Sequence, residues 1–161
     1  MSWLQDHPRI LEFAYTATRS LIGWMRPLWK AIGYDRTQRI IRPLEETPKK
    51  LLFDCRMCGQ CILHSTGMTC PMRCPKNERN GPCGGVLQDG RCEVYPDLPC
   101  VWVLAWERSR MLPLWRDDMT RLSPPVDWRL SGTSSWENLL TGRDKQVPAG
   151  WKLAETARAG G

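Results

Sequence analysis

The sequence predicts a small protein of α-helices and irregular chain, with a cysteine-rich metal-binding core, short flanking helices and an extended C-terminal arm. Three observations support this fold class. All eight cysteines lie within residues 55–100 of a 161-residue chain. Apolar residues before and after this stretch recur at helical spacing, and glycines and prolines interrupt the stretch itself. We therefore expect an N-terminal helical segment (1–45), a cysteine-rich domain (46–112) and a C-terminal docking arm with a tail (113–161).

The N-terminal segment is predicted to form an amphipathic helix from Ile10 to Lys30, bent at Pro27. Its apolar positions follow helical spacing, and its charged positions form an opposite stripe. The apolar positions are Ile10, Ala14, Ala17, Leu21, Trp24 and Leu28, and the charged positions are Glu12, Arg19, Arg26 and Lys30. We expect the apolar face to pack on the same chain or on a partner, with binding at a membrane surface as the alternative.

Charge and targeting signals limit the classes of function. The net charge of +6 is spread along the chain without a polybasic run, so we do not expect nucleic-acid binding. No secretory signal is recognisable at the N-terminus, and charged residues interrupt the apolar segment before it could span a membrane. We expect a cytoplasmic protein. Motifs of hydrolases, kinases or zinc proteases are missing from the sequence, so an independent enzyme is not expected.

Two further regions have helical patterns. Two prolines interrupt residues 36–53, so we expect short helical turns there rather than one helix. Residues Val101–Met111 are predicted to form a helix that begins just after the last cysteine, with Trp102 and Trp106 covering one face. Another short helix is expected within Trp115–Leu122.

The C-terminal arm is predicted to be extended from residue 124 until a capping box. In this pattern, Ser134-x-x-Glu137, the side chain of the serine caps a new helix and the acidic residue stabilises its first turn. Gly142 is the expected stop signal. We expect residues 147–161 to be a loosely held tail.

The cysteines follow the spacing C-x2-C-x2-C-x8-C-x3-C-x8-C-x8-C-x7-C. Because thiols stay reduced in the cytosol, this density favours metal over disulfides. Structural zinc sites usually combine two C-x2-C pairs, and the second pair is missing. The first triplet and the later C-x3-C-P element are both parts of the bacterial ferredoxin signature. We predict that all eight are metal ligands: Cys55, Cys58, Cys61, Cys70, Cys74, Cys83, Cys92 and Cys100.

Eight thiolates suffice for two [4Fe–4S] clusters, with zinc as the alternative and disulfides as the third possibility. The assignment of cysteines to clusters stays open, because the ligands of a run can cross between clusters. We expect Cys55, Cys58 and Cys61 to share one cluster with a more distant cysteine. His64 is a possible but unfavoured ligand, since a lone histidine here is more often hydrogen-bonded.

The run LFDCRMCGQCILHSTGMTCPMRCPKNERNGPCGG, followed by RCEV and PCVWVLAW, resembles the methylenetetrahydrofolate reductase C-terminal domain family, a small cysteine-rich partner subunit of a flavin-dependent reductase. The resemblance covers about residues 50–106, and PPVDWRLSGTSSW extends it. It implies that the eight cysteines are cluster ligands and that this chain is a non-catalytic subunit.

The resemblance also implies a partner and a redox route. The partner is a TIM-barrel subunit that holds FMN and reduces methylenetetrahydrofolate to methyltetrahydrofolate. Ferredoxin or flavodoxin is the expected electron donor, and two [4Fe–4S] clusters in this chain relay the electrons to FMN. Because the family is also described as zinc-binding, a structural zinc scaffold without a redox role is the alternative.

Overall fold

The structure is a computed structural model that describes residues 6–146; the predicted tail, residues 147–161, lies outside them. Within the described residues the chain is helical and irregular and has no β-strand, which confirms the predicted fold class. Two isolated antiparallel bridges join Val86 to Cys92 and Arg91 to Pro99. The α-helices are α1 (Pro8–Trp24), α2 (Arg26–Ile32), α3 (Tyr34–Phe53), α4 (Val101–Ser109) and α5 (Ser135–Thr141). The 3₁₀ helices are η2 (Leu63–Thr66), η3 (Pro71–Arg73), η4 (Arg116–Thr120), η5 (Trp128–Leu130) and η6 (Arg143–Lys145).

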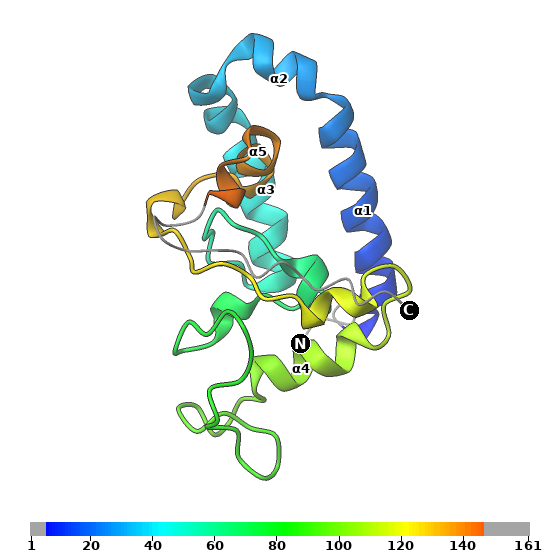
Figure 1. Ribbon diagram of the computed structural model, residues 1–161, viewed down its shortest axis with the longest axis vertical. Helices are drawn as coiled ribbons and strands as arrows, with labels where there is room; N and C mark the ends of the chain where they lie inside the picture. The colour runs from blue at the N-terminus through cyan, green and yellow to red at the C-terminus, as the bar shows by residue number, and fades with distance from the viewer. Residues whose placement is uncertain (1–5, 147–161) are drawn as a thin grey trace, which may run out of the picture.

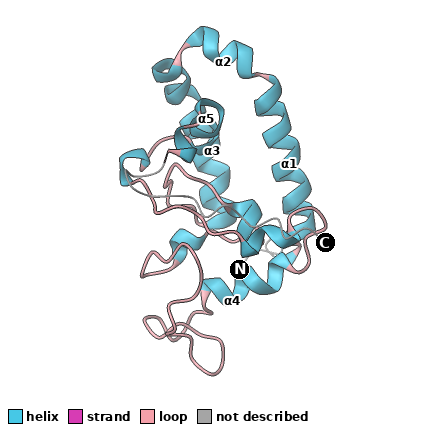
Figure 2. Ribbon diagram, in the orientation of Figure 1, coloured by secondary structure: helices cyan, strands magenta, loops and turns pink. Residues whose placement is uncertain are grey.

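The first three helices form an arch, with α1 and α3 as its sides and α2 across one end (Figure 1). The cysteine-bearing residues leave the end of α3 and reach α4 almost entirely as loop (Figure 2). After α4 the chain returns to the arch, where α5 packs against α3 and α1. The division into residues 1–45, 46–112 and 113–161 stays a prediction.

Helix α3 is one continuous helix, so the predicted break at its two prolines is wrong. Pro43 and Pro48 both lie inside it, on its exposed side. Each proline removes one helical hydrogen bond, and the carbonyl groups that lose their donors belong to exposed residues, where water can replace the bond. Every fourth residue on the other side is buried, and this packing holds the helix together. The buried side chains are Ile41, Glu45, Lys49 and Phe53.

The predicted N-terminal helix is present and bends where expected. It divides at Met25 into α1 and α2, and Pro27 occupies the first turn of α2. Proline is well suited to this position, because its missing N–H would have no partner in the first turn of a helix. The bend lets α2 lead the chain across to α3.

The expectation that the apolar face of this helix packs on the same chain is wrong, whereas packing on a partner stays a prediction. The apolar positions are exposed on this chain: Ile10, Ala14, Ala17, Leu21, Trp24 and Leu28. Glu12, expected on the polar face, is completely buried. Its Oε1 accepts hydrogen bonds from the backbone N–H groups of Leu114 (3.0 Å) and Trp115 (2.8 Å). These bonds satisfy Oε1, whereas Oε2 is buried and has no hydrogen-bond partner among residues 6–146. Together with the burial of Leu11 and Ile22, the two bonds hold this side of α1 inward.

The helices after the cysteines agree with their sequence signals. Helix α4 starts directly after Cys100, and η4 lies within the range where a short helix was expected. At the start of α5, the Ser134 Oγ accepts a hydrogen bond from the backbone N–H of Glu137 (3.3 Å). The helix stops at Gly142, whose φ of 75° is left-handed. Both ends of α5 are therefore as predicted.

A buried polar network joins α3 to the start of α5. The Glu45 carboxylate is fully buried and accepts hydrogen bonds from the hydroxyl groups of Ser134 and Ser135. Lys49 Nζ donates to Glu45 Oε1 (2.5 Å) and to Ser135 Oγ (2.8 Å). A carboxylate near a helix N-terminus also interacts favourably with the helix dipole. Glu45 therefore attaches the C-terminal arm to the middle of α3.

We predict that the Glu45→Gln substitution costs about 3–5 kcal/mol of unfolding free energy, because it leaves the buried Lys49 charge without its partner. Urea unfolding of the metal-loaded protein, prepared without oxygen, measures this loss. Glu46→Gln is the matched control. Glu46 pairs with Arg42 and Lys50 at the surface, so we expect a loss of at most about 1 kcal/mol. Equal losses for the two variants would contradict the role given to Glu45.

Candidate metal centre

The structure gathers the eight cysteines into two groups of four, and none of them forms a disulfide. The first group lines one cavity and consists of Cys55, Cys58, Cys61 and Cys70. The second group lines a separate cavity and consists of Cys74, Cys83, Cys92 and Cys100. The partner that joins the N-terminal triplet is therefore Cys70, and the groups follow chain order. That these thiols bind metal stays a prediction.

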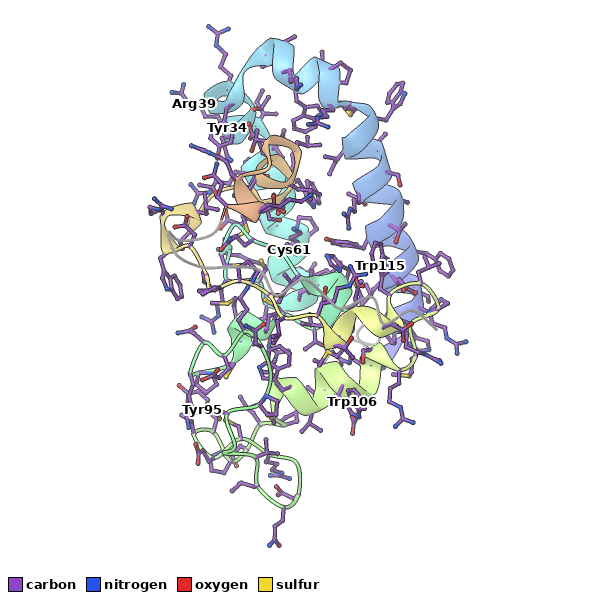
Figure 3. All side chains as sticks on the ribbon, in the orientation of Figure 1. Tyr34, Arg39, Cys61, Tyr95, Trp106 and Trp115 are labelled. Atoms are coloured by element: carbon purple, nitrogen blue, oxygen red, sulfur yellow. The ribbon has the colours of Figure 1, made fainter. Side chains whose placement is uncertain are left out.

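The first group lies beside α3, as Cys61 shows in Figure 3. Cys70 is buried, and the other three cysteines are half-buried. Left-handed backbone at Asp54, Met57 and Gly59 turns the chain sharply after α3, so that cysteines three residues apart reach the same cavity. Glycine is required at position 59 for its left-handed backbone and also because no Cβ atom fits there. A Cβ at this position would lie 2.3 Å from the carbonyl oxygen of Leu130, which packs over the loop.

Contacts within the first group change the acidity of its thiols. The pKa of Cys55 falls to about 7, mainly because the Cys70 thiol donates a hydrogen bond to its sulfur. The same hydrogen bond raises the pKa of Cys70 well above its ordinary value. Burial raises the pKa of Cys58. Since metals bind thiolates, a bound metal has to displace the protons of Cys58 and Cys70.

Two buried cations line the same cavity, and the sequence analysis missed both. Lys49 is 5% exposed and Arg79 is 7% exposed. Burial alone would lower the pKa of Lys49, but the nearby Cys61 and Glu45 raise it above its ordinary value. In the sequence, the position of Lys49 six residues before the first cysteine could have indicated that it lies near the first group. Arg79 lies in the loop between Cys74 and Cys83 and had no comparable signal, because only the tertiary structure turns its side chain toward the first group.

The second group lies at the far end of the molecule from α2, in the loops that hold Tyr95 (Figure 3). Cys74 is buried, Cys92 and Cys100 are half-buried and Cys83 is exposed. Backbone hydrogen bonds close the loops: Cys92 N–H donates to Leu98 O (3.0 Å) and Cys100 N–H donates to Gly90 O (2.9 Å). The cavity between these cysteines measures about 430 Å³, against about 20 Å³ for the first group. The first cavity is thus small and the second large.

Tryptophan forms part of the wall of the second cavity. Trp102 is 5% exposed, and its Nε1 donates to Glu78 O at 3.2 Å. Trp106 is 53% exposed on α4 and does not line this cavity. The two residues therefore do not cover one face together, because α4 packs only its inner side against the cysteine loops.

The donor chemistry fits a thiolate-bound metal centre. Each cavity offers four cysteine sulfurs, and the first also offers two cations that offset negative charge. Within residues 6–146, no three cysteine, histidine or carboxylate side chains already stand at the spacing of ligands around a single ion. His64 instead places its Nδ1 3.1 Å from Asp118 Oδ2 and 2.8 Å from Ser65 Oγ. His64 therefore lies in a hydrogen-bonded position, and it lines neither of the two cysteine cavities.

A comparison with protein families matches residues 34–129 to the family described as methylene-tetrahydrofolate reductase C terminal. The match covers more than half of the chain and includes α3, all eight cysteines and α4. The chain belongs to this family. Comparisons with curated proteins and with solved structures found no match.

Membership of the methylenetetrahydrofolate reductase C-terminal family confirms the resemblance and extends it. The matched range begins at the start of α3 and ends within η5, so the Glu45 and Lys49 positions belong to it, whereas α1 and α2 precede it. The family description associates the chain with methylenetetrahydrofolate reductase. In the part of this family member that the structure describes, no helix has the length and apolar character needed to cross a membrane.

We predict that the two groups bind metal independently. Replacing Cys55 and Cys58 together by serine should remove roughly half of the bound metal, and so should replacing Cys83 and Cys92, because each pair lies within one group. Replacing Cys58 and Cys92 together should remove nearly all of it. Metal analysis of anaerobically purified variants makes the comparison. Similar losses in all three double variants would contradict the grouping.

Proposed function

We propose that this chain is the electron-transfer subunit of a methylenetetrahydrofolate reductase and that its two groups of cysteines bind two [4Fe–4S] clusters. In this proposal electrons pass from a low-potential donor protein, ferredoxin or flavodoxin, to FMN in a TIM-barrel catalytic subunit. The observation that carries the proposal is the arrangement of eight free thiols as four and four in separate cavities. The family description supplies the reductase as partner.

The residues around the first group fit this role. An iron–sulfur cluster supplies reversible one-electron transfer when bound. The backbone N–H of Met57 donates to Cys55 Sγ at 3.3 Å, and hydrogen bonds to ligand sulfurs are one means by which proteins set cluster potentials. Lys49, which is paired with Glu45 at 2.5 Å, lines the same cavity. The apolar side chains of Leu63 and Met72, which also line the cavity, exclude water from it.

Structural zinc is the alternative, and one observation favours it. The cavity of the first group measures about 20 Å³, which is close to the space that a single water molecule occupies. Four thiolates complete a tetrahedral zinc site without an open position. In that case the chain would stabilise or position the reductase and would have no redox role, since zinc does not change its oxidation state.

Analysis of iron, sulfide and zinc in the anaerobically purified protein decides between these functions. We predict about eight iron atoms and eight sulfides per chain, four of each for every [4Fe–4S] cluster. The visible and EPR spectra should show clusters that dithionite reduces. A colourless protein with stoichiometric zinc would disprove the electron-transfer proposal. About four irons with one zinc would restrict the clusters to one of the two groups.

We propose that the exposed apolar face of α1 and α2 contacts the reductase subunit. Its large side chains are Ile10, Phe13, Leu21, Trp24, Leu28 and Ile32, all at least 39% exposed. Monomeric proteins rarely leave a continuous apolar stripe of this kind in water. Glu12 fixes the opposite side of α1 to the rest of the chain, so this face is held outward. The reductase is the partner that the family description supports.

We predict that Trp24→Ala weakens binding to the purified flavin-containing reductase subunit by about 2 kcal/mol or more, because tryptophan is a frequent interface anchor. Trp24 is 79% exposed. Isothermal titration calorimetry measures the affinity. Trp128→Ala is the matched control, since Trp128 is 59% exposed on η5, outside this face. Unchanged affinity for Trp24→Ala would exclude this face as the interface.

A further inference from the structure

Arg79 is a buried cation whose charge the described part of the chain does not balance. Its side chain is 7% exposed and lines the cavity of the first group. Nη2 donates to the carbonyl oxygen of Gln60 at 2.8 Å. Nε and Nη1 are buried and have no hydrogen-bond partner among residues 6–146, and no ion pair joins Arg79 to a carboxylate there. Buried charges are costly unless they are paired, so the guanidinium requires an anion.

The sulfurs of the first group line the same cavity as Arg79 and are candidates for that anion. The Gln60 carbonyl oxygen that accepts from Arg79 also accepts from Cys58 Sγ, at 3.7 Å. The guanidinium and the Cys58 sulfur therefore flank one oxygen atom. Lys49, the other cation at this cavity, is already paired with Glu45 at 2.5 Å. Arg79 is thus the cation available to a centre that becomes more negative.

The backbone on either side of Arg79 is held in place. The carbonyl of Glu78 accepts from Trp102 Nε1 at 3.2 Å. Asn80 exchanges two hydrogen bonds with the backbone of Ser123, at 2.8 Å and 2.7 Å. Arg79 itself belongs to the loop between two cysteines of the second group, yet its side chain reaches the first. Such fixed support is typical of a residue that positions charge at a functional site.

We propose that Arg79 balances the negative charge of the first centre and raises its reduction potential relative to the second. This inference rests on the proposed function, in which the first group holds an iron–sulfur cluster. One-electron reduction by a reductant such as dithionite adds one negative charge to the centre. A buried cation close by stabilises the reduced form more than the oxidised form, and Nε and Nη1 are the donors available to the sulfurs.

The test is a redox titration of the anaerobically purified protein, followed by EPR. The Cys55→Ser/Cys58→Ser variant identifies the signal of the first group. In Arg79→Met and Arg79→Gln, the equilibrium constant for one-electron reduction of that signal should fall at least about tenfold, which is about 59 mV for a one-electron couple. The reduction potential of the other signal should not change. Arg79→Lys, which keeps the charge, should shift less, and Arg129→Met, at an exposed arginine paired with Asp127, should not shift either signal.

Other results for the Arg79 variants would also support or overturn the role proposed for Arg79. Loss of metal from the first group alone in Arg79→Met and Arg79→Gln supports the inference, because the charge of that centre is then unbalanced. Unchanged potentials, equal shifts of both signals, or loss of metal from both groups would overturn it. If the native protein holds zinc and no iron, the electron-transfer proposal fails separately. Arg79 is then tested by zinc release to a chelator, which should be at least about tenfold faster in Arg79→Met; an unchanged rate would overturn its role.

Discussion

A buried carboxylate, that of Glu45, holds the centre of this structure together. It accepts hydrogen bonds from Lys49 of its own helix and from the hydroxyl groups of Ser134 and Ser135, where α5 begins. The arm is attached there, and its residues Leu130 and Thr133 pack over Gly59 in the loop of the first cysteine group. The small cavity around these cysteines therefore depends on a polar contact that lies outside the cysteine stretch.

A second buried carboxylate attaches the N-terminal helix in the same way. Glu12 is buried and receives two backbone N–H groups from residues 114 and 115. In a chain without strands in its described part, few backbone hydrogen bonds connect distant segments, so buried side-chain acceptors take over this task. Because Glu12 fixes one side of α1, the apolar side remains exposed. The exposed face is thus a consequence of how the helix is anchored and is available to a partner.

The two cysteine groups differ in environment although they have the same ligands. The first has a small cavity, lies beside α3 and is flanked by two buried cations, whereas the second lies in loops, has a large cavity and includes an exposed cysteine. Burial, nearby charge and hydrogen bonds to sulfur all influence the potential of a metal centre. In the proposed electron relay, these differences would give the two centres different reduction potentials.

The sequence by itself determined the fold class, the family and the complete set of candidate ligands. These properties are local: cysteine spacing, the capping box at Ser134 and the stop at Gly142 act over a few residues. The tertiary structure decided the rest. It kept α3 continuous across Pro43 and Pro48, because a buried face compensates for lost hydrogen bonds, and it buried Glu12 where the hydrophobic pattern placed it outside. It also separated the cysteines into two groups and brought Arg79 to the first. Such contacts depend on where loops meet in space, and they produce no periodic pattern in the sequence.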